Sequence, residues 1–107
     1  MTRTPRMARI EALLADDPAD PFLRYGLAME YVSAGDDATA ARLLTELIDS
    51  TPDRPYVPAF LMAGQVLNRL ARVAEACDVL RKGVEAARVQ GNDHARGEME
   101  GLLVSIE

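Results

Sequence analysis

The sequence has no tryptophan, one histidine, one cysteine and no long apolar run. With Cys77 as its sole cysteine, the chain has no internal disulfide, which favours a reducing compartment. No segment approaches the ~18 apolar residues of a membrane-spanning helix. Residues 10–15 are too short and too polar for the core of a signal peptide. We therefore expect a soluble, cytoplasmic protein with no membrane partner.

Basic residues are also in short supply. Lysine and arginine number 12 against 17 aspartates and glutamates, for a net charge of −5, and the arginines are spread along the chain. Because nucleic-acid binding requires a basic surface, we expect no nucleic-acid partner. A composition of 49% hydrophobic and 27% charged residues is typical of a folded domain, and the length predicts a single domain over residues 1–107.

Residues that commonly carry chemistry are few and isolated. A metal site or a general base needs partners, and Asp93, adjacent to His94, does not share a helix face with it. Cys77 lies in an apolar helical pattern and is interpreted as a small core residue. The pairs Asp16-Asp17 and Asp36-Asp37 are interpreted as caps and turns, since calcium needs six or more oxygen ligands. The sequence predicts no catalytic residue, metal site or cofactor.

The stretch from Asp20 to Pro52 predicts two helices folded back on each other. Asp20 is a suitable N-cap for the first helix, with Pro21 at the first helical position, and Gly35 ends this helix. Asp36 is a suitable N-cap for the second helix, which Pro52 ends. Apolar side chains recur at helical spacing in both segments: Leu23, Leu27, Ala28 and Tyr31, then Leu43, Leu44, Leu47 and Ile48.

This hairpin resembles one tetratricopeptide repeat (TPR). The elements Leu27-Ala28-x-x-Tyr31, Ala40-x-x-x-Leu44 and Pro52 follow the pattern W-x2-L-G-x2-Y…A-x3-F…P of that family. The resemblance implies a stack of helical hairpins that holds other proteins.

Matching positions recur along the chain. Spacings of 34 residues, the period of the family, join Ile10 to Leu44, Leu13 to Leu47, Leu14 to Ile48 and Pro18 to Pro52. A helix that begins at Thr4-Pro5, with Thr4 as its cap, and is ended by Asp16-Asp17-Pro18 is therefore predicted as the second half of a repeat that lacks its first half. Its apolar stripe is Met7, Ile10, Leu13 and Leu14.

A second full repeat follows at a spacing of 36, as from Leu44 to Leu80, because two extra residues enter the turn at 53–56. Its pattern is Phe60-x-x-Ala63-Gly64-x-x-Leu67, then Ala76-x-x-x-Leu80. Its turn has Ala71 where the first repeat has Gly35, so we expect a less sharply specified turn there. Small residues are expected where helices approach closely: Ala28, Ala40, Gly64 and Ala76.

A last helix, capped by Asn92 or Asp93, carries one apolar stripe and suits a terminal cap. The stripe consists of Ala95, Met99, Leu102, Leu103 and Ile106. The fold prediction is an all-α, TPR-like α-solenoid of about six antiparallel helices: a half repeat, two full repeats and a C-terminal capping helix.

The helix that begins at Pro21 has a second apolar stripe, which in this family corresponds to the face of a concave groove that takes up a peptide or a helix. By that resemblance, the partner-binding candidates are Phe22, Tyr25, Met29, Leu61, Gln65, Asn68 and Arg69. An aromatic and a methionine supply adaptable apolar area, and an amide can bind a peptide backbone.

The resemblance implies a non-catalytic protein–protein interaction scaffold or adaptor with a protein or peptide partner. Two alternatives stay open from the residues alone: the second stripe packs inside the protein, or it is the homodimer contact of a self-associating structural helical protein. A carboxylate-binding subtype would use Asn68 and Arg69, but the first repeat has Val32 and Ser33 at the corresponding places.

Overall fold

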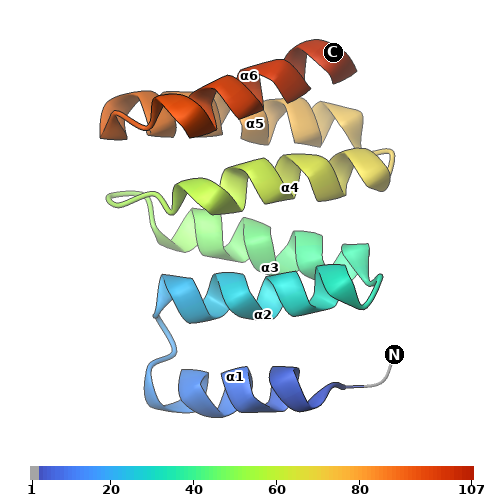
Figure 1. The fold of residues 1–107 in the computed structure, drawn as a ribbon, viewed down its shortest axis with the longest axis vertical. Helices are drawn as coiled ribbons and strands as arrows, with labels where there is room; N and C mark the ends of the chain where they lie inside the picture. Colours follow the sequence, from blue (N-terminus) through green and yellow to red (C-terminus); the bar gives the residue numbers. More distant parts are fainter. Residues whose placement is uncertain (1–2) are drawn as a thin grey trace.

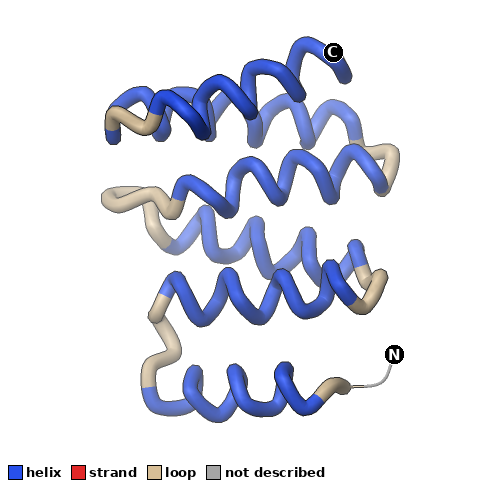
Figure 2. Tube along the Cα trace, viewed as in Figure 1, coloured by secondary structure: helices blue, strands red, loops and turns tan. Residues whose placement is uncertain are grey.

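The computed structural model describes residues 3–107, which form six α-helices and no strand. The helices are α1 (Pro5–Asp16), α2 (Pro21–Ser33), α3 (Asp37–Ser50), α4 (Val57–Arg69), α5 (Val73–Gln90) and α6 (Asp93–Ile106). They run in alternating directions across the picture and form a stack from α1 at the bottom to α6 at the top (Figure 1). Short loops join them at alternate sides of the stack (Figure 2). The predicted all-α solenoid of a half repeat, two repeats and a cap is confirmed.

Side-chain caps begin four of the helices, as the sequence indicates. The Asp20 carboxylate accepts hydrogen bonds from the backbone N–H groups of Phe22 (2.9 Å) and Leu23 (3.2 Å). The side chains of Thr4, Asp36 and Asn92 cap α1, α3 and α6 in the same way. Each cap satisfies a backbone donor that has no partner inside the helix, and this fixes where the helix begins.

The two hairpin turns close with the same geometry. After α2, Asp36 N donates to Tyr31 O at 2.9 Å and Gly35 takes φ +80°; after α4, Arg72 N donates to Leu67 O at 2.9 Å and Ala71 takes φ +62°. Both are left-handed Schellman ends, in which the residue past the helix favours glycine. The expectation of a less defined turn at Ala71 is wrong, because Ala71 adopts the same left-handed conformation as Gly35 and the same hydrogen bond closes the turn.

Small residues lie where the helices approach most closely, as predicted. Ala28, Ala40 and Ala76 are fully buried. A Cβ on Gly64 would lie 2.5 Å from Leu80 Cδ2, and one on Gly83 would lie 2.5 Å from both Phe60 Cβ and Met99 Sδ. The backbone of α5 therefore lies directly against side chains of α4 and α6, and this spacing leaves no room for a methyl group.

The two ends of the stack are finished differently. At the C-terminal end, α6 buries Met99 fully, and this side chain belongs to one core cluster with Val57, Phe60 and Leu80. At the N-terminal end, Met7 is buried, whereas Leu13 is 51% exposed. Leu13 is a member of the predicted apolar stripe of α1, and the stack leaves this large apolar side chain in solvent.

Alanine at two glycines of the last helices tests the close approach. We expect Gly83→Ala to destabilise the protein by about 1 kcal/mol or more, since overpacking outweighs the gain in helix propensity. Gly97, for which a Cβ would meet nothing within 4 Å, is the matched control. Gly97→Ala should stabilise by about 0.5–1 kcal/mol. Urea denaturation measures both, and equal effects would contradict the packing described for Gly83.

Exchanging glycine and alanine at the two turns tests the backbone conformation at Ala71. Ala71→Gly should stabilise the protein by about 0.5–1 kcal/mol, because glycine adopts positive φ without steric cost. Gly35→Ala should destabilise it by about 1 kcal/mol for the opposite reason. Thermal unfolding of the two variants beside wild type gives the comparison, and a lower melting temperature for Ala71→Gly would show that the alanine is unstrained.

Candidate functional site

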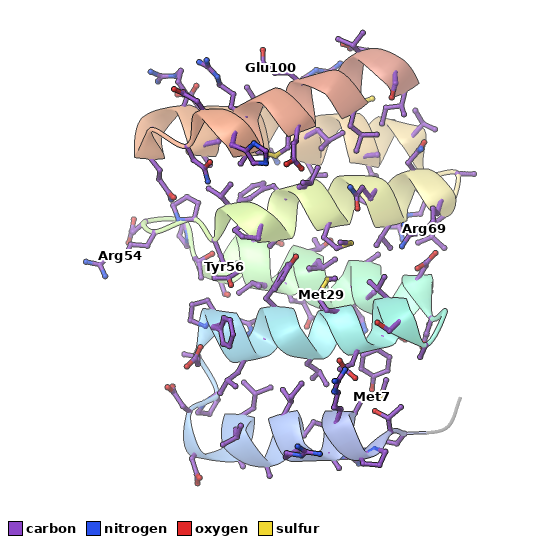
Figure 3. The ribbon with its side chains drawn as sticks, viewed as in Figure 1. Met7, Met29, Arg54, Tyr56, Arg69 and Glu100 are labelled. Atoms are coloured by element: carbon purple, nitrogen blue, oxygen red, sulfur yellow. The ribbon has the colours of Figure 1, made fainter. Side chains whose placement is uncertain are left out.

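The predicted binding residues on α2 and α4 lie in separate environments. Figure 3 shows Met29 and Tyr56 in the space between these two helices and Arg69 at the far end of α4. Phe22 is 70% exposed, and it lines a hollow of about 370 Å³ together with Met29 of the same helix and Ile10 and Leu13 of α1. We call this hollow the α1/α2 hollow. Arg6, Arg9, Gly26 and Glu30 complete its lining.

Tyr25 is partly buried against another ring. Its ring centroid lies 5.3 Å from that of Tyr56, with the planes tilted by 47°. Burial raises the pKa of Tyr25, and the neighbouring Tyr56 raises it further. Tyr25 therefore packs α2 against the start of α4. For this residue of the second apolar stripe, internal packing is the alternative that fits.

Leu61 also packs inside the molecule. It lies against the cluster that contains Val57, Phe60 and Met99, so the capping helix covers the part of α4 where Leu61 lies. Gln65 and Asn68, further along α4, keep part of their surface in solvent.

Arg69 makes a two-point ion pair with Asp37 at the start of α3. Its Nε lies 3.0 Å from Asp37 Oδ2 and its Nη2 lies 3.1 Å from Oδ1. The hydrogen bond from the Arg69 guanidinium holds the pKa of Asp37 below its usual range. Paired guanidinium and carboxylate planes fix each other's orientation, so this contact ties α3 of the first repeat to α4 of the second.

The structure thus brings Phe22 and Met29 together in the lining of the α1/α2 hollow, whereas none of the candidates on α4 lines it. Sequence reasoning missed the contribution of α1 to the site, namely Arg6, Arg9 and Leu13. The signal that could have found it is the apolar stripe of α1, because Ile10 and Leu13 of that stripe line the hollow together with Phe22.

His94 and Cys77, whose side chains commonly act in catalysis or metal binding, have structural surroundings here. His94 pairs with Glu98 on the exposed side of α6, and Cys77 is a buried free thiol. Residues 3–107 contain no group of three or more His, Cys, Asp and Glu side chains placed to hold a metal ion. Within the same described range, none of the helices has both the length and the apolarity needed to cross a membrane.

Comparison with known proteins identifies the family. The model of the tetratricopeptide repeat family matches residues 1–55, just over half of the chain, which cover α1, α2 and α3. A TPR repeat-containing protein of Pseudomonas aeruginosa is 26% identical over 98 residues, which are 92% of this chain and 91% of that protein.

Solved structures agree with this assignment. The crystal structure of a tetratricopeptide repeat domain protein from Salinibacter ruber superposes with a TM-score of 0.75 at 32% identity, over 81% of this chain and 94% of that one. A solution structure from the same organism gives a TM-score of 0.77 at 33% identity, over 84% and 89%. The chain belongs to the tetratricopeptide repeat family, and its fold is of the kind that generally mediates protein–protein interaction.

Removing the guanidinium of Arg69 tests the ion pair on α4. In Arg69→Gln, the pKa of Asp37 should rise toward its ordinary value, while that of Asp36, which hydrogen bonds from Thr39 lower, should stay unchanged. Because the pKa of Asp37 is lower in the folded state than in the unfolded state, the ion pair stabilises the folded protein at pH values above the unfolded pKa of ~3.9. This stabilisation is lost as the pH falls through the pKa that Asp37 has in the folded state. NMR titration of the two carboxyl carbons checks this, and an unchanged Asp37 would exclude the pair in solution.

Proposed function

We propose that this protein is a non-catalytic interaction scaffold that binds a peptide or helix of a partner protein at the α1/α2 hollow. The observation that carries the proposal is the exposure of two large apolar side chains, Phe22 and Leu13, on the two walls of one hollow. Burying such a side chain is worth roughly 1.5–3 kcal/mol, and exposed apolar patches commonly mark interaction sites.

The charges around the hollow favour a particular partner chemistry. Arg6 lies 3.7 Å from Glu30, a long ion pair, and Arg9 has no ion-pair partner among residues 3–107. This basic rim stands out on a chain with a net charge of −5. The proposed partner segment therefore presents apolar anchors flanked by aspartate or glutamate, which the arginines would attract.

The alternative function is self-association through the same apolar surface, and it predicts a different oligomeric state. Two copies would pair through the exposed Phe22 and Leu13 side chains, and the surface would be covered without a foreign partner. Sedimentation velocity of the purified protein distinguishes the two, because the proposed scaffold remains a monomer.

Affinity capture from the native cell with charge variants tests the proposed face. Leu13→Glu/Phe22→Glu should lose the partner that wild type captures, because two carboxylates would be driven into an apolar contact beside acidic partner residues. Val104→Glu is the matched control, since Val104 is 76% exposed on the outer side of α6 and lies far from the hollow in the stack. Both variants should melt cooperatively by circular dichroism.

Two results would overturn the proposal. One is capture of the same proteins by wild type and by Leu13→Glu/Phe22→Glu. The other is a wild-type dimer that the double substitution converts to a monomer, which would assign the hollow to self-association.

A further inference from the structure

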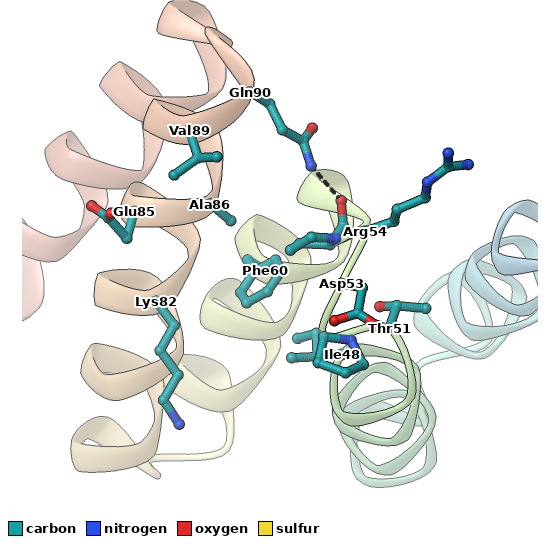
Figure 4. A pocket seen from close by; sticks show the side chains of 12 residues that line it. Ile48, Thr51, Asp53, Arg54, Phe60, Lys82, Glu85, Ala86, Val89 and Gln90 are labelled. Atoms are coloured by element: carbon teal, nitrogen blue, oxygen red, sulfur yellow. Dashed lines mark hydrogen bonds between the residues drawn. The ribbon is translucent and has the colours of Figure 1, made fainter.

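A larger hollow lies between other helices, on the side of the stack that α3 and α5 form. These two helices lie behind α2, α4 and α6 in Figure 1. The hollow has a volume of about 710 Å³. Figure 4 shows Ile48 on one wall, Ala86 and Val89 of α5 on the other, and Phe60 of α4 between them. We call it the α3/α5 hollow.

The longer turn between the two repeats builds one end of this hollow. Pro52, Asp53, Arg54 and Pro55 all line it, and these residues coincide with the two-residue lengthening of the repeat period. Gln90 Nε2 donates a hydrogen bond to Pro55 O at 2.8 Å and so attaches the turn to the last residue of α5. This hydrogen bond therefore fixes the longer turn at one end of the hollow between α3 and α5.

The apolar lining of the α3/α5 hollow is accessible. Val89 is 70% exposed at its edge, although it lies beside Phe60, which is buried. The Cβ of Phe60 packs against the α5 backbone at Gly83, which fixes the position of this residue beside the hollow. The volume falls within the roughly 300–1,000 Å³ that binding pockets usually have.

The charges at the α3 side of the hollow are negative and uncompensated. Asp53 lines the hollow, and Asp49 lines an adjoining one; neither has an ion-pair partner within the described range 3–107. The last turn of α3 contains no basic residue, so the partial negative charge of the helix C-terminus adds to the two carboxylates.

The basic side chains nearby do not neutralise these carboxylates. Lys82 pairs with Asp78 at 3.1 Å on its own helix, and Arg54 is directed away from the hollow in Figure 4. Glu85, on the α5 wall, is held by Arg88. The hollow therefore combines an apolar interior with a negative potential at its α3 edge.

The hollow continues along α3 into a second, more polar one. An adjoining hollow of about 310 Å³ shares Ile48 and Lys82 with it and extends along α3 to Thr45. From Thr45 to Thr51 the joined groove follows α3 for about two helical turns. This length suits a short polypeptide segment rather than a single side chain.

We propose that the α3/α5 hollow is a second interaction site, which takes a short segment of a partner protein that combines apolar and basic residues. Apolar side chains of the segment insert between Ile48, Phe60 and Val89. Lysine or arginine side chains of the segment lie against Asp49 and Asp53. The site uses other helices than the α1/α2 hollow and the opposite charge at its rim, so it does not depend on the function proposed above.

A pair of synthetic helical peptides provides the probe. The first has two leucines four residues apart with lysines on either side, and the second has glutamate at every lysine position. In an NMR titration of the full chain, the lysine peptide should shift the amides of Ile48, Asp53, Ala86 and Val89. It should bind at least tenfold more tightly than the glutamate peptide, with an affinity that falls as salt is added.

Three variants separate the contribution of charge to binding from that of the fold. Asp49→Asn/Asp53→Asn should weaken binding of the lysine peptide about five- to tenfold, as expected for two partly exposed ion pairs. Asp93→Asn/Glu100→Gln removes the same charge from α6 and should leave the affinity unchanged. Val89→Lys, at an exposed position, should block the hollow without unfolding the protein and abolish the shifts.

The proposal is overturned if the two peptides bind equally, if Asp49→Asn/Asp53→Asn binds as wild type does, or if the shifts occur at Phe22 and Leu13 instead. It is also overturned if sedimentation shows a dimer that Val89→Lys dissociates, because the occupant would then be a second copy of the chain. Failure of the α1/α2 hollow to bind a partner leaves these measurements unaffected, since the Leu13→Glu/Phe22→Glu variant should bind the lysine peptide as wild type does.

Discussion

Neighbouring helices approach most closely where one of them has an alanine or a glycine, and the stack depends on these contacts. The α5 backbone at Gly83 rests on Phe60 of α4 and on Met99 of α6, so one residue sets the spacing of three helices. Gly64 receives Leu80 in the same way. Because a packed interior accepts little extra volume, these positions decide how far apart the hairpins lie and which surfaces stay uncovered.

The two hollows are built by different parts of the stack. At the first, Leu13 of α1 lies in solvent and lines the hollow together with Phe22 of α2. At the second, the longer turn after α3 forms one end of the hollow, and Gln90 holds this turn against the end of α5. The free charges at their edges differ in sign, with Arg9 at the first and with Asp49 and Asp53 on the α3 side of the second.

Much of the fold could be predicted because local rules and the repeat period agree. Asp20 and Asp36 mark helix starts through their own hydrogen bonds, and Gly35 marks an end through its positive φ. The candidate site was less predictable. Tyr25 and Leu61 share a pattern with Phe22, but they are covered by Tyr56 and the capping helix, and a helical pattern does not show which of its neighbours fold over it.

The sequence by itself determined the helices, their order and the membership of the TPR family, because caps, turns and apolar spacing act over a few residues and repeat along the chain. Tertiary structure alone decided that Ala71 adopts a left-handed turn, that Arg69 binds Asp37, and that the lengthened turn opens a hollow against α5. The ion pair and the hollow depend on contacts between segments distant in sequence, and the packing of whole helices decides where these segments meet. Ala71 adopts a positive φ that alanine by itself disfavours, so its own backbone preference does not indicate this turn.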